Sequence, residues 1–325
     1  MQTSPAYCRK RRADAGLNHR TARMSDNRAS PRQSGGILGT RAEGVALVLF
    51  TACSWGISWP VAKFLLEQLP PFSMRTAVGA IGCGFAFAVA LARRERIHPP
   101  HGQWGWLVVF AMLNFGLFIV LTTQALVWLT ASEAVIITYT LPIWASVLAW
   151  PLLGERPTIR KGAALVLGLS GVALLVGVGS VEATWAKLPG VALGFTAAWL
   201  FGLGTVIAKR HPLKMPPATG VAWQAAIGTI PVGVLGLWEA PSWNEVTAVG
   251  WGAATYIGTI PLTVAYLAWF RALRLVPAST AATTVLVSPV MGVLGSALML
   301  GEALGPRQIV ALAMTVTGVA LAARG

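Results

Sequence analysis

The sequence predicts an all-α polytopic membrane protein whose ten transmembrane helices form two inverted five-helix repeats. Three observations support this class: 55% of the 325 residues are hydrophobic, only 11% are charged, and the second half repeats motifs of the first. Roughly a quarter of an ordinary soluble chain is charged. A soluble body cannot cover its surface with so few charges, so lipid must surround most of the chain beyond Glu43.

Residues 1–43 form a polar, basic segment ahead of the apolar part. Nine of the 25 Lys and Arg residues lie here, as do both Asp residues, Asp14 and Asp26. The segment has no apolar run of signal-peptide length, so we expect a disordered cytoplasmic tail that holds the N-terminus inside. A nucleic-acid-binding arm is the weaker alternative, since no aromatic residue is interleaved with the arginines. Met24 is a second candidate for the true start.

From Gly44 to Ala323, apolar stretches alternate with short connectors that are charged or contain proline. A transmembrane helix takes about 20 residues. Ten such helices, together with the connectors between them, fit into residues 44–323. The predicted spans are 44–64, 72–92, 104–125, 131–153, 159–179, 188–208, 218–238, 248–270, 278–300 and 307–323.

Charges in the connectors predict the orientation. With both termini inside, the inner connectors hold eleven Lys and Arg residues and the outer side holds four, which satisfies the positive-inside rule. The inner set is Arg93, Arg94, Arg96, Arg156, Arg160, Lys161, Lys209, Arg210, Lys214, Arg271 and Arg274. The outer set is Lys63, Arg75, Lys187 and Arg307. We therefore expect both termini in the cytoplasm.

The two halves share motifs at a nearly constant spacing of 147 or 146 residues, which divides the chain into a first repeat, 44–180, and a second repeat, 188–323. The matched positions are Ala131-Ser132 with Ala278-Ser279, Pro142 with Pro289, Gly154-Glu155 with Gly301-Glu302, and Gly44–Leu47 with Gly190–Leu193. Each repeat holds five spans. Because five is odd, the second repeat must lie inverted in the membrane, with Glu155 on the inner side and Glu302 on the outer.

Inverted repeats are typical of alternating-access transporters, whose substrate site lies near the bilayer midplane at the repeat interface. Six spans, the first, third, fourth, sixth, eighth and ninth, are then expected to line a central cavity. Channels also arise from inverted repeats, so a passive pore for small solutes stays an alternative. A membrane scaffold that transports nothing is the third class.

The composition excludes several enzyme classes. His19, His98, His101 and His211 lie in the tail or in connectors, so no imidazole is available at membrane depth for a Ser–His hydrolase or a zinc protease. No Asp follows Asp26, which excludes an intramembrane aspartyl protease. No Lys follows a Gly, which excludes a P-loop, and the three cysteines lack a ligand spacing. We expect neither an enzyme nor a metal or cofactor, and the energy must come from a gradient.

Once per half, Ala-Ser is followed by a mid-span Pro, then Gly-Glu, then a Gly-rich helix. The pattern is clearest in the stretches Tyr139–Trp144 and Gly154–Arg156, and it resembles the EamA-like branch of the drug/metabolite transporter superfamily. Arg75 resembles the Arg that opens the second helix there. The resemblance covers residues 44–323. It implies a ten-helix permease or exporter of small metabolites in the bacterial inner membrane, working without ATP, and a homodimer stays an open alternative for its assembly.

Pro142 and Pro289 lie mid-span at matching places in the two repeats. Each lacks an amide hydrogen and frees the carbonyl four residues back, at Thr138 and Val285. In lipid such carbonyls need protein or cavity water as partners. Matching breaks in both halves point to the substrate site and to gating kinks. A simple packing kink is the alternative.

Glu133 is the one acidic residue inside a predicted span, near its outer end. A carboxylate there predicts a proton-coupling or cation-binding role, because burying its charge is costly. The favoured alternative is an interfacial Glu that faces water or pairs with Arg75 or Lys63. Its counterpart Thr280 cannot ionise, so any coupling role belongs to one repeat.

Polar and aromatic residues inside the spans complete the cavity candidates: Trp55, Asn114, Thr138, Tyr139, Trp199, Gln224, Tyr256, Thr259 and Thr284. In the eighth span Thr255, Thr259, Thr263 and Tyr266 predict one continuous stripe. The alternatives are hydroxyls that bond back to their own helix, amides that only join helices, and tryptophans that only pack. We expect Gly154-Glu155 and Gly301-Glu302 to be structural, each carboxylate meeting free amide hydrogens at the start of a helix.

Overall fold

The computed structural model describes residues 34–154, 158–176, 181–276, 280–281 and 284–324, and every regular element within these ranges is helical. The first repeat contains α1 (Ser34–Leu66), α2 (Pro71–Ala92), α3 (Trp104–Phe110), η1 (Ala111–Gly116), α4 (Leu117–Trp128), α5 (Ala131–Thr138), α6 (Leu141–Leu153) and α7 (Ile159–Val176). The second contains α8 (Val181–Arg210), α9 (Pro217–Gly236), η2 (Trp243–Glu245), α10 (Ala248–Thr259), η3 (Ile260–Val264), α11 (Ala265–Leu275), α13 (Val287–Leu300) and α14 (Pro306–Arg324).

Seven stretches of the described chain are long and apolar enough to cross a membrane, and three shorter apolar helices accompany them. The long stretches are Arg41–Leu66, Pro71–Ala92, Trp104–Trp128, Ala131–Leu153, Trp185–Arg210, Pro217–Gly236 and Ala248–Leu275. The shorter helices are Gly162–Leu174, Val287–Leu300 and Pro306–Leu321. The all-helical membrane class is confirmed. The count of ten transmembrane helices stays a prediction, although the ten stretches follow the predicted spans in order.

Helix α1 begins at Ser34, so the end of the predicted disordered tail, residues 34–43, is helical. Residues 1–33 lie outside the described part of the chain. The first span is therefore preceded by a helical extension rather than by an unstructured segment.

Helices α2 and α9, the second spans of the two repeats, run in opposite directions. The Glu239 carboxylate, beyond the end of α9, accepts hydrogen bonds from the amides of Phe72 (3.1 Å) and Ser73 (2.6 Å) at the start of α2. The Glu95 carboxylate, beyond the end of α2, accepts from the amide (2.9 Å) and the hydroxyl (3.2 Å) of Thr219 at the start of α9. Each helix end thus lies beside the other's beginning, as inverted repeats require.

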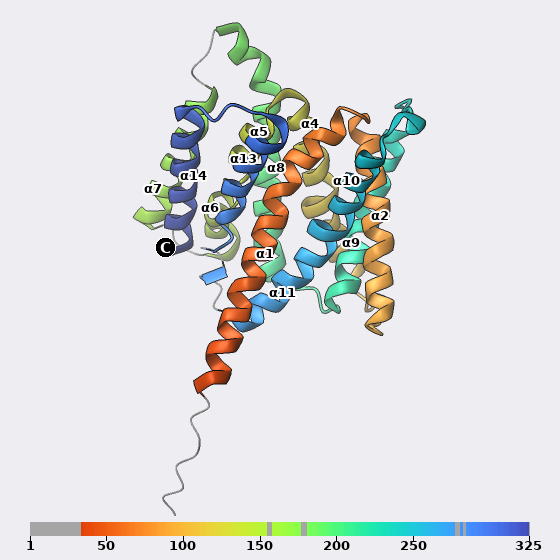
Figure 1. The fold of residues 1–325 in the computed structure, drawn as a ribbon. Helices are drawn as coiled ribbons and strands as arrows, with labels where there is room; N and C mark the ends of the chain where they lie inside the picture. Colours follow the sequence, from red (N-terminus) through yellow and green to blue (C-terminus); the bar gives the residue numbers. More distant parts are fainter. Residues whose placement is uncertain (1–33, 155–157, 177–180, 277–279, 282–283, 325) are drawn as a thin grey trace, which may run out of the picture.

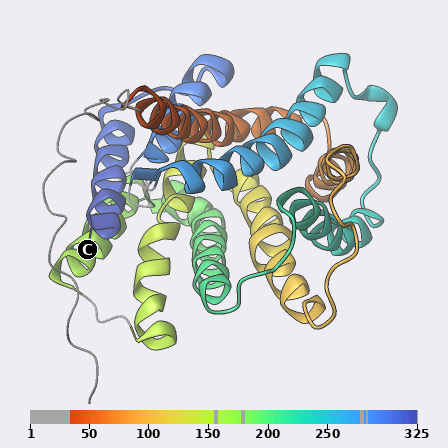
Figure 2. The same cartoon turned by 90° about the horizontal axis from the view of Figure 1, so that it is seen from below.

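The bundle has two faces, which we name after residues that lie there. Helix α1 ends and α2 begins at the Glu302 face, whereas α1 begins and α14 ends at the Glu43 face, the lower end in Figure 1. At the Glu43 face, the Arg271 guanidinium pairs with Glu43 at 2.5 Å. Helices α2 and α9 pack together at one edge of the bundle, and α7 and α14 at the opposite edge (Figure 1). Seen from below, α1 lies alongside α11 between these edges (Figure 2).

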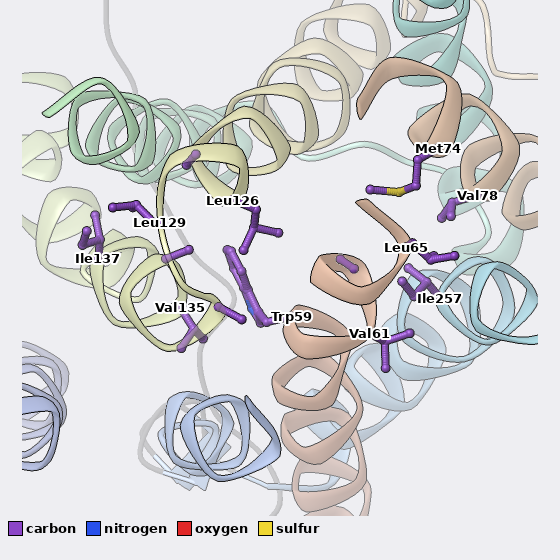
Figure 3. Close-up of a cluster of buried hydrophobic side chains, with 14 of the residues drawn as sticks. Trp59, Val61, Leu65, Met74, Val78, Leu126, Leu129, Val135, Ile137 and Ile257 are labelled. Carbon is purple, nitrogen blue, oxygen red and sulfur yellow. The ribbon is translucent and has the colours of Figure 1, made fainter. Parts of the chain in front are cut away.

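The apolar core differs between the two faces. In the half near the Glu302 face, one cluster joins side chains of both repeats. Figure 3 shows Trp59 beside Leu126 and Val135, and Leu65 nearer to Ile257. In the half near the Glu43 face, the buried side chains form three separate clusters, which include Phe115, Ile143 and Val48 respectively. The described helices therefore share one apolar cluster in the half near the Glu302 face, whereas in the half near the Glu43 face they pack in three separate clusters.

Labelling of single cysteines tests this two-faced arrangement in a chain freed of Cys8, Cys53 and Cys83. Exposed Glu67 and Ala303 belong to the Glu302 face, and exposed Arg96 and Lys214 to the Glu43 face. We expect a membrane-impermeant maleimide to label Glu67→Cys and Ala303→Cys in intact cells, and Arg96→Cys and Lys214→Cys only in inverted vesicles. Labelling of Glu67→Cys and Arg96→Cys from the same side would contradict the fold.

Candidate functional site

The fourth span is broken into two helices at its middle. Helix α5 is buried along its whole length and ends at Thr138, and α6 begins at Leu141 after the turn at Tyr139-Thr140. Pro142 occupies the first turn of α6, where its missing amide hydrogen would have no helical partner anyway. Pro142 therefore marks the start of a second helix rather than a bend within one.

The ninth span has a corresponding break. Val285 and Leu286 form a turn, and α13 begins at Val287 with Pro289 in its first turn. The carbonyl of Val285, which we expected to be free, accepts a hydrogen bond from the Ser288 amide at 2.9 Å. This carbonyl therefore has its partner within the protein, which is one of the two outcomes expected for a carbonyl freed by proline.

The two breaks meet. The hydroxyl of Tyr139, in the turn between α5 and α6, is hydrogen-bonded to the hydroxyl of Ser288, in the first turn of α13. Ser288 is fully buried. The broken helices of the two repeats thus contact each other at the positions where their regular hydrogen bonding stops.

Aromatic rings from the first, third and eighth spans lie beside this contact. The Trp55 ring packs against Tyr266 with 5.2 Å between ring centres and against Trp269 with 5.8 Å. Its indole N–H donates to the carbonyl of Pro261 at 3.0 Å. Tyr266 also contacts Phe115 with 5.4 Å between ring centres, and it lies near Tyr139. We call Trp55, Phe115, Tyr266 and Trp269 the aromatic cluster.

Three polar atoms in the third and fourth spans are buried without a hydrogen-bond partner. They are the side-chain carbonyl oxygen of Asn114 in η1, the hydroxyl of Thr138 at the end of α5, and the indole N–H of Trp144 in α6. Leaving such a group unpaired costs about 1–3 kcal/mol. A bound molecule or cavity water would complete these bonds.

Glu133 is engaged on both carboxylate oxygens. One oxygen accepts from the Lys187 ammonium at 2.6 Å, and the other accepts from the Thr130 amide at 3.1 Å. The Glu133 amide in turn donates to the Thr130 hydroxyl oxygen at 3.2 Å, which completes a capping box at the start of α5. The Glu133 carboxylate is therefore ion-paired, but its partner is Lys187.

The partners we expected for Glu133 serve other groups. The Arg75 guanidinium donates to the Thr123 hydroxyl. The Lys63 ammonium donates to the carbonyls of Leu126 and Leu129, the latter at 3.0 Å, where α4 ends. Pairing of Glu133 with Arg75 or Lys63 was a wrong prediction, because both bases already bind the third span.

The hydroxyls of the eighth span do not form one stripe. The π-helical turn η3 follows Thr259 and contains Thr263, and it shifts the register of the side chains because its bonds run from residue i to i+5. Thr255 is exposed, whereas Thr263 is fully buried and lies 3.5 Å from the carbonyl of Gly82. Thr259 donates to the carbonyl of Thr255 in its own helix at 2.7 Å. The continuous stripe was a wrong prediction.

The remaining candidates have varied surroundings. The Gln224 amide donates to Gly220 in its own helix at 3.2 Å, and the Tyr256 hydroxyl lies 3.5 Å from the Ser54 carbonyl. Trp199 is 40% exposed, and Thr284 is half-buried next to the second break. None of these four belongs to the aromatic cluster as the structure describes it.

The two Gly-Glu motifs end helices. Gly154 follows α6 with φ 73° and Gly301 follows α13 with φ 67°, a left-handed conformation that glycine adopts without strain. Glu155 lies outside the described residues. The Glu302 carboxylate accepts from the amides of Ala131 (2.7 Å) and Ser132 (3.0 Å) and from the Ser132 hydroxyl (2.6 Å). It thus meets the start of a helix, as expected of its charge, but the helix is α5 of the other repeat.

Apolar helices in two inverted repeats, with broken helices meeting at the repeat interface, define a multi-pass membrane protein of the transporter type. The EamA-like transporter family matches the chain twice, over residues 42–177 and 188–324, and the chain belongs to this family. It is accordingly a membrane transporter of small solutes, a class of protein that is in general not enzymatic.

Curated relatives cover most of the chain. It is 28% identical to the uncharacterized transporter YvbV of Bacillus subtilis (strain 168), over 85% of this chain and 90% of that one. It is 29% identical to the uncharacterized transporter YwfM of the same organism, over 84% and 90% of the two chains. A solved structure described only as the crystal structure of a protein shares the fold, with a TM-score of 0.63 and 22% identity over 86% of this chain and 96% of that one.

The pair between Glu133 and Lys187 can be tested by a double-mutant cycle. Lys187→Met leaves the buried carboxylate without its cation and should lower stability by about 2 kcal/mol. Adding Glu133→Gln, which keeps the capping box, should restore most of the loss. Thermal unfolding of the purified protein in detergent measures both effects. Equal stability of the single and double variants would mean that the pair does not form.

Proposed function

We propose that the protein is a secondary transporter that exports small metabolites across the bacterial inner membrane by alternating access, without ATP. One observation carries the proposal: the broken helices of two inverted repeats meet at their breaks through Tyr139 and Ser288. Irregular backbone at membrane depth is tolerated only inside protein or beside a cavity. In secondary transporters such breaks supply the substrate site at the repeat interface.

The groups around the breaks suit a small amphipathic molecule. Thr138, Trp144 and Asn114 offer a hydroxyl, an N–H donor and a carbonyl acceptor that lack partners in the protein. The aromatic cluster offers flat apolar surface, and Tyr and Trp rings favour apolar or cationic groups. A substrate placed against both would satisfy the unpaired atoms and cover the rings. This division favours a molecule with a polar end and an apolar end.

The uneven core supports alternating access. A single cluster closes the half near the Glu302 face, and three separate clusters leave the half near the Glu43 face less joined. The positive-inside rule places the Glu43 face, with Arg93, Arg96, Lys209 and Arg274, in the cytoplasm. The arrangement then corresponds to a form that is closed outside, ready to receive substrate from the cell.

Comparison of metabolites inside and outside cells with and without the gene tests the function. We expect at least one small metabolite to accumulate inside cells that lack the protein. That metabolite, radiolabelled, should then undergo counterflow exchange in proteoliposomes that contain the purified chain. Saturation and counterflow identify a carrier. Flux that never saturates would identify a pore instead, and no flux with any altered metabolite would favour a scaffold.

The breaks should be required for transport. Replacing Pro142 and Pro289 with Ala removes a penalty of about 3 kcal/mol each against a continuous helix. We expect the double variant to insert normally, as judged by its yield in the membrane fraction, and to lower the exchange rate about tenfold or more. Full exchange by the double variant would remove the breaks from the mechanism.

The unpaired hydroxyl of Thr138 should bind the substrate rather than stabilise the fold. Thr138→Val keeps the shape and removes the polar atom, so stability should stay unchanged or rise by up to about 1 kcal/mol. The KM for exchange should rise about fivefold, because one hydrogen bond to the substrate is lost. Thr122→Val is the matched control, because the Thr122 hydroxyl already bonds to the carbonyls of Phe118 and Ile119. An unchanged KM in Thr138→Val would contradict a substrate contact.

A further inference from the structure

Three glutamates follow helices and bind the starts of helices in the other repeat. Glu95 follows α2 and binds α9, Glu239 follows α9 and binds α2, and Glu302 follows α13 and binds α5. Helices α2 and α9 are consequently tied at both ends at once. The contact of Glu302 with α5 ties the ninth span to the fourth at the Glu302 face.

The four free amides at the start of α5 are shared between local and distant partners. The Glu133 amide donates to the Thr130 hydroxyl oxygen, and the Thr130 amide donates to the Glu133 carboxylate. The amides of Ala131 and Ser132 depend on Glu302, 171 and 170 residues away. Because α5 has its own capping box, the bonds from Glu302 are an addition that links the repeats rather than the means by which the helix begins.

The charges around Glu302 favour this closed contact. The Lys63 ammonium interacts electrostatically with Glu302, Glu67 and Glu133 while it binds the carbonyls at the end of α4. Lys187 pairs with Glu133 on the same end of α5. The junction between α4 and α5 is therefore held by the first span, the sixth span and the connector after α13.

Opening the Glu302 face requires α5 to separate from α13. Val135 of α5 is fully buried, and Gly292 of α13 packs against it so closely that an added Cβ would lie 2.9 Å from Val135. Both residues lie within or against the single cluster that closes this half. Glu302 is only half-buried near the end of the bundle, so water can replace its bonds when the helices part.

We propose that Glu302 is a latch: its bonds to Ala131 and Ser132 hold the Glu302 face closed, and their release opens the substrate route on that face. Glu95 and Glu239 instead keep α2 and α9 together as one rigid pair throughout transport. The latch rests on the proposed alternating-access function, and it assigns Glu302 to positioning the fourth span rather than to touching substrate.

Accessibility of a buried cysteine tests the latch without any substrate. Val135→Cys is placed in a chain freed of its own cysteines, and sealed vesicles that expose the Glu302 face are treated with an impermeant maleimide. Adding Glu302→Gln removes the charge that the two amides bind, and labelling should become about tenfold faster. Ser132→Ala, which removes only the hydroxyl donor, should give a smaller increase and keeps the test valid if Glu302→Gln fails to fold.

Glu239→Gln is the matched control. It removes the same kind of carboxylate from the start of α2, and labelling of Val135→Cys should not change. Equal acceleration by Glu239→Gln and Glu302→Gln would overturn the proposal, since general loosening would explain both. If neither Glu302→Gln nor Ser132→Ala accelerates labelling, the proposal is overturned as well.

The labelling result is independent of the transport result. If the native chain exchanges a metabolite and Glu302→Gln leaves labelling unchanged, the latch fails and the carrier function stands. If no metabolite is exchanged but Glu302→Gln and Ser132→Ala accelerate labelling in the expected order, the closed contact stands and the carrier function fails.

Discussion

Every backbone amide and carbonyl inside a bilayer needs a partner within the protein, and the structure depends on how the broken helices meet this constraint. The break in the fourth span adds helix ends within the membrane, and further helix ends lie at the connector between α4 and α5. The start of α5 is satisfied by Thr130 and by Glu302 of the other repeat. The end of α4 is satisfied by Lys63 of the first span. Completing the hydrogen bonds where the third span ends and the fourth begins thus requires side chains from the first span and from the connector after α13, which ties the repeats together.

The same constraint explains why carboxylates follow the helices they do. An anion beside the start of a helix is stabilised by the free amides and by the helix dipole. In an inverted repeat, the end of a helix lies beside the start of its counterpart, so a Glu just past one helix reaches the other. Glu95 and Glu239 show this arrangement reciprocally at opposite faces of the α2–α9 pair. The few charged residues in the apolar part of the chain therefore hold helix ends together at its boundaries.

The sequence predicted the repeat and its inversion because both follow from the spacing of motifs and from an odd number of spans. It predicted the two breaks because proline leaves a local signal at Pro142 and Pro289. The π-helical turn η1 carries no such signal in Ala111–Gly116. Its counterpart η3 was missed although it contains Pro261, so the register of Thr263 was misjudged. The partner of Glu133 was misjudged because four basic residues share the predicted outer side, and only packing decides that Lys187 reaches it.

Similar repeats arranged by an exact two-fold axis would pack alike at both faces, but the described core does not. Part of the difference between the two faces follows from the sequence, since Glu133 corresponds to Thr280 and only the first repeat has a carboxylate at this position. In the proposed alternating-access cycle, the unequal packing corresponds to one of two related conformations. A small free-energy difference between them is what alternating access requires.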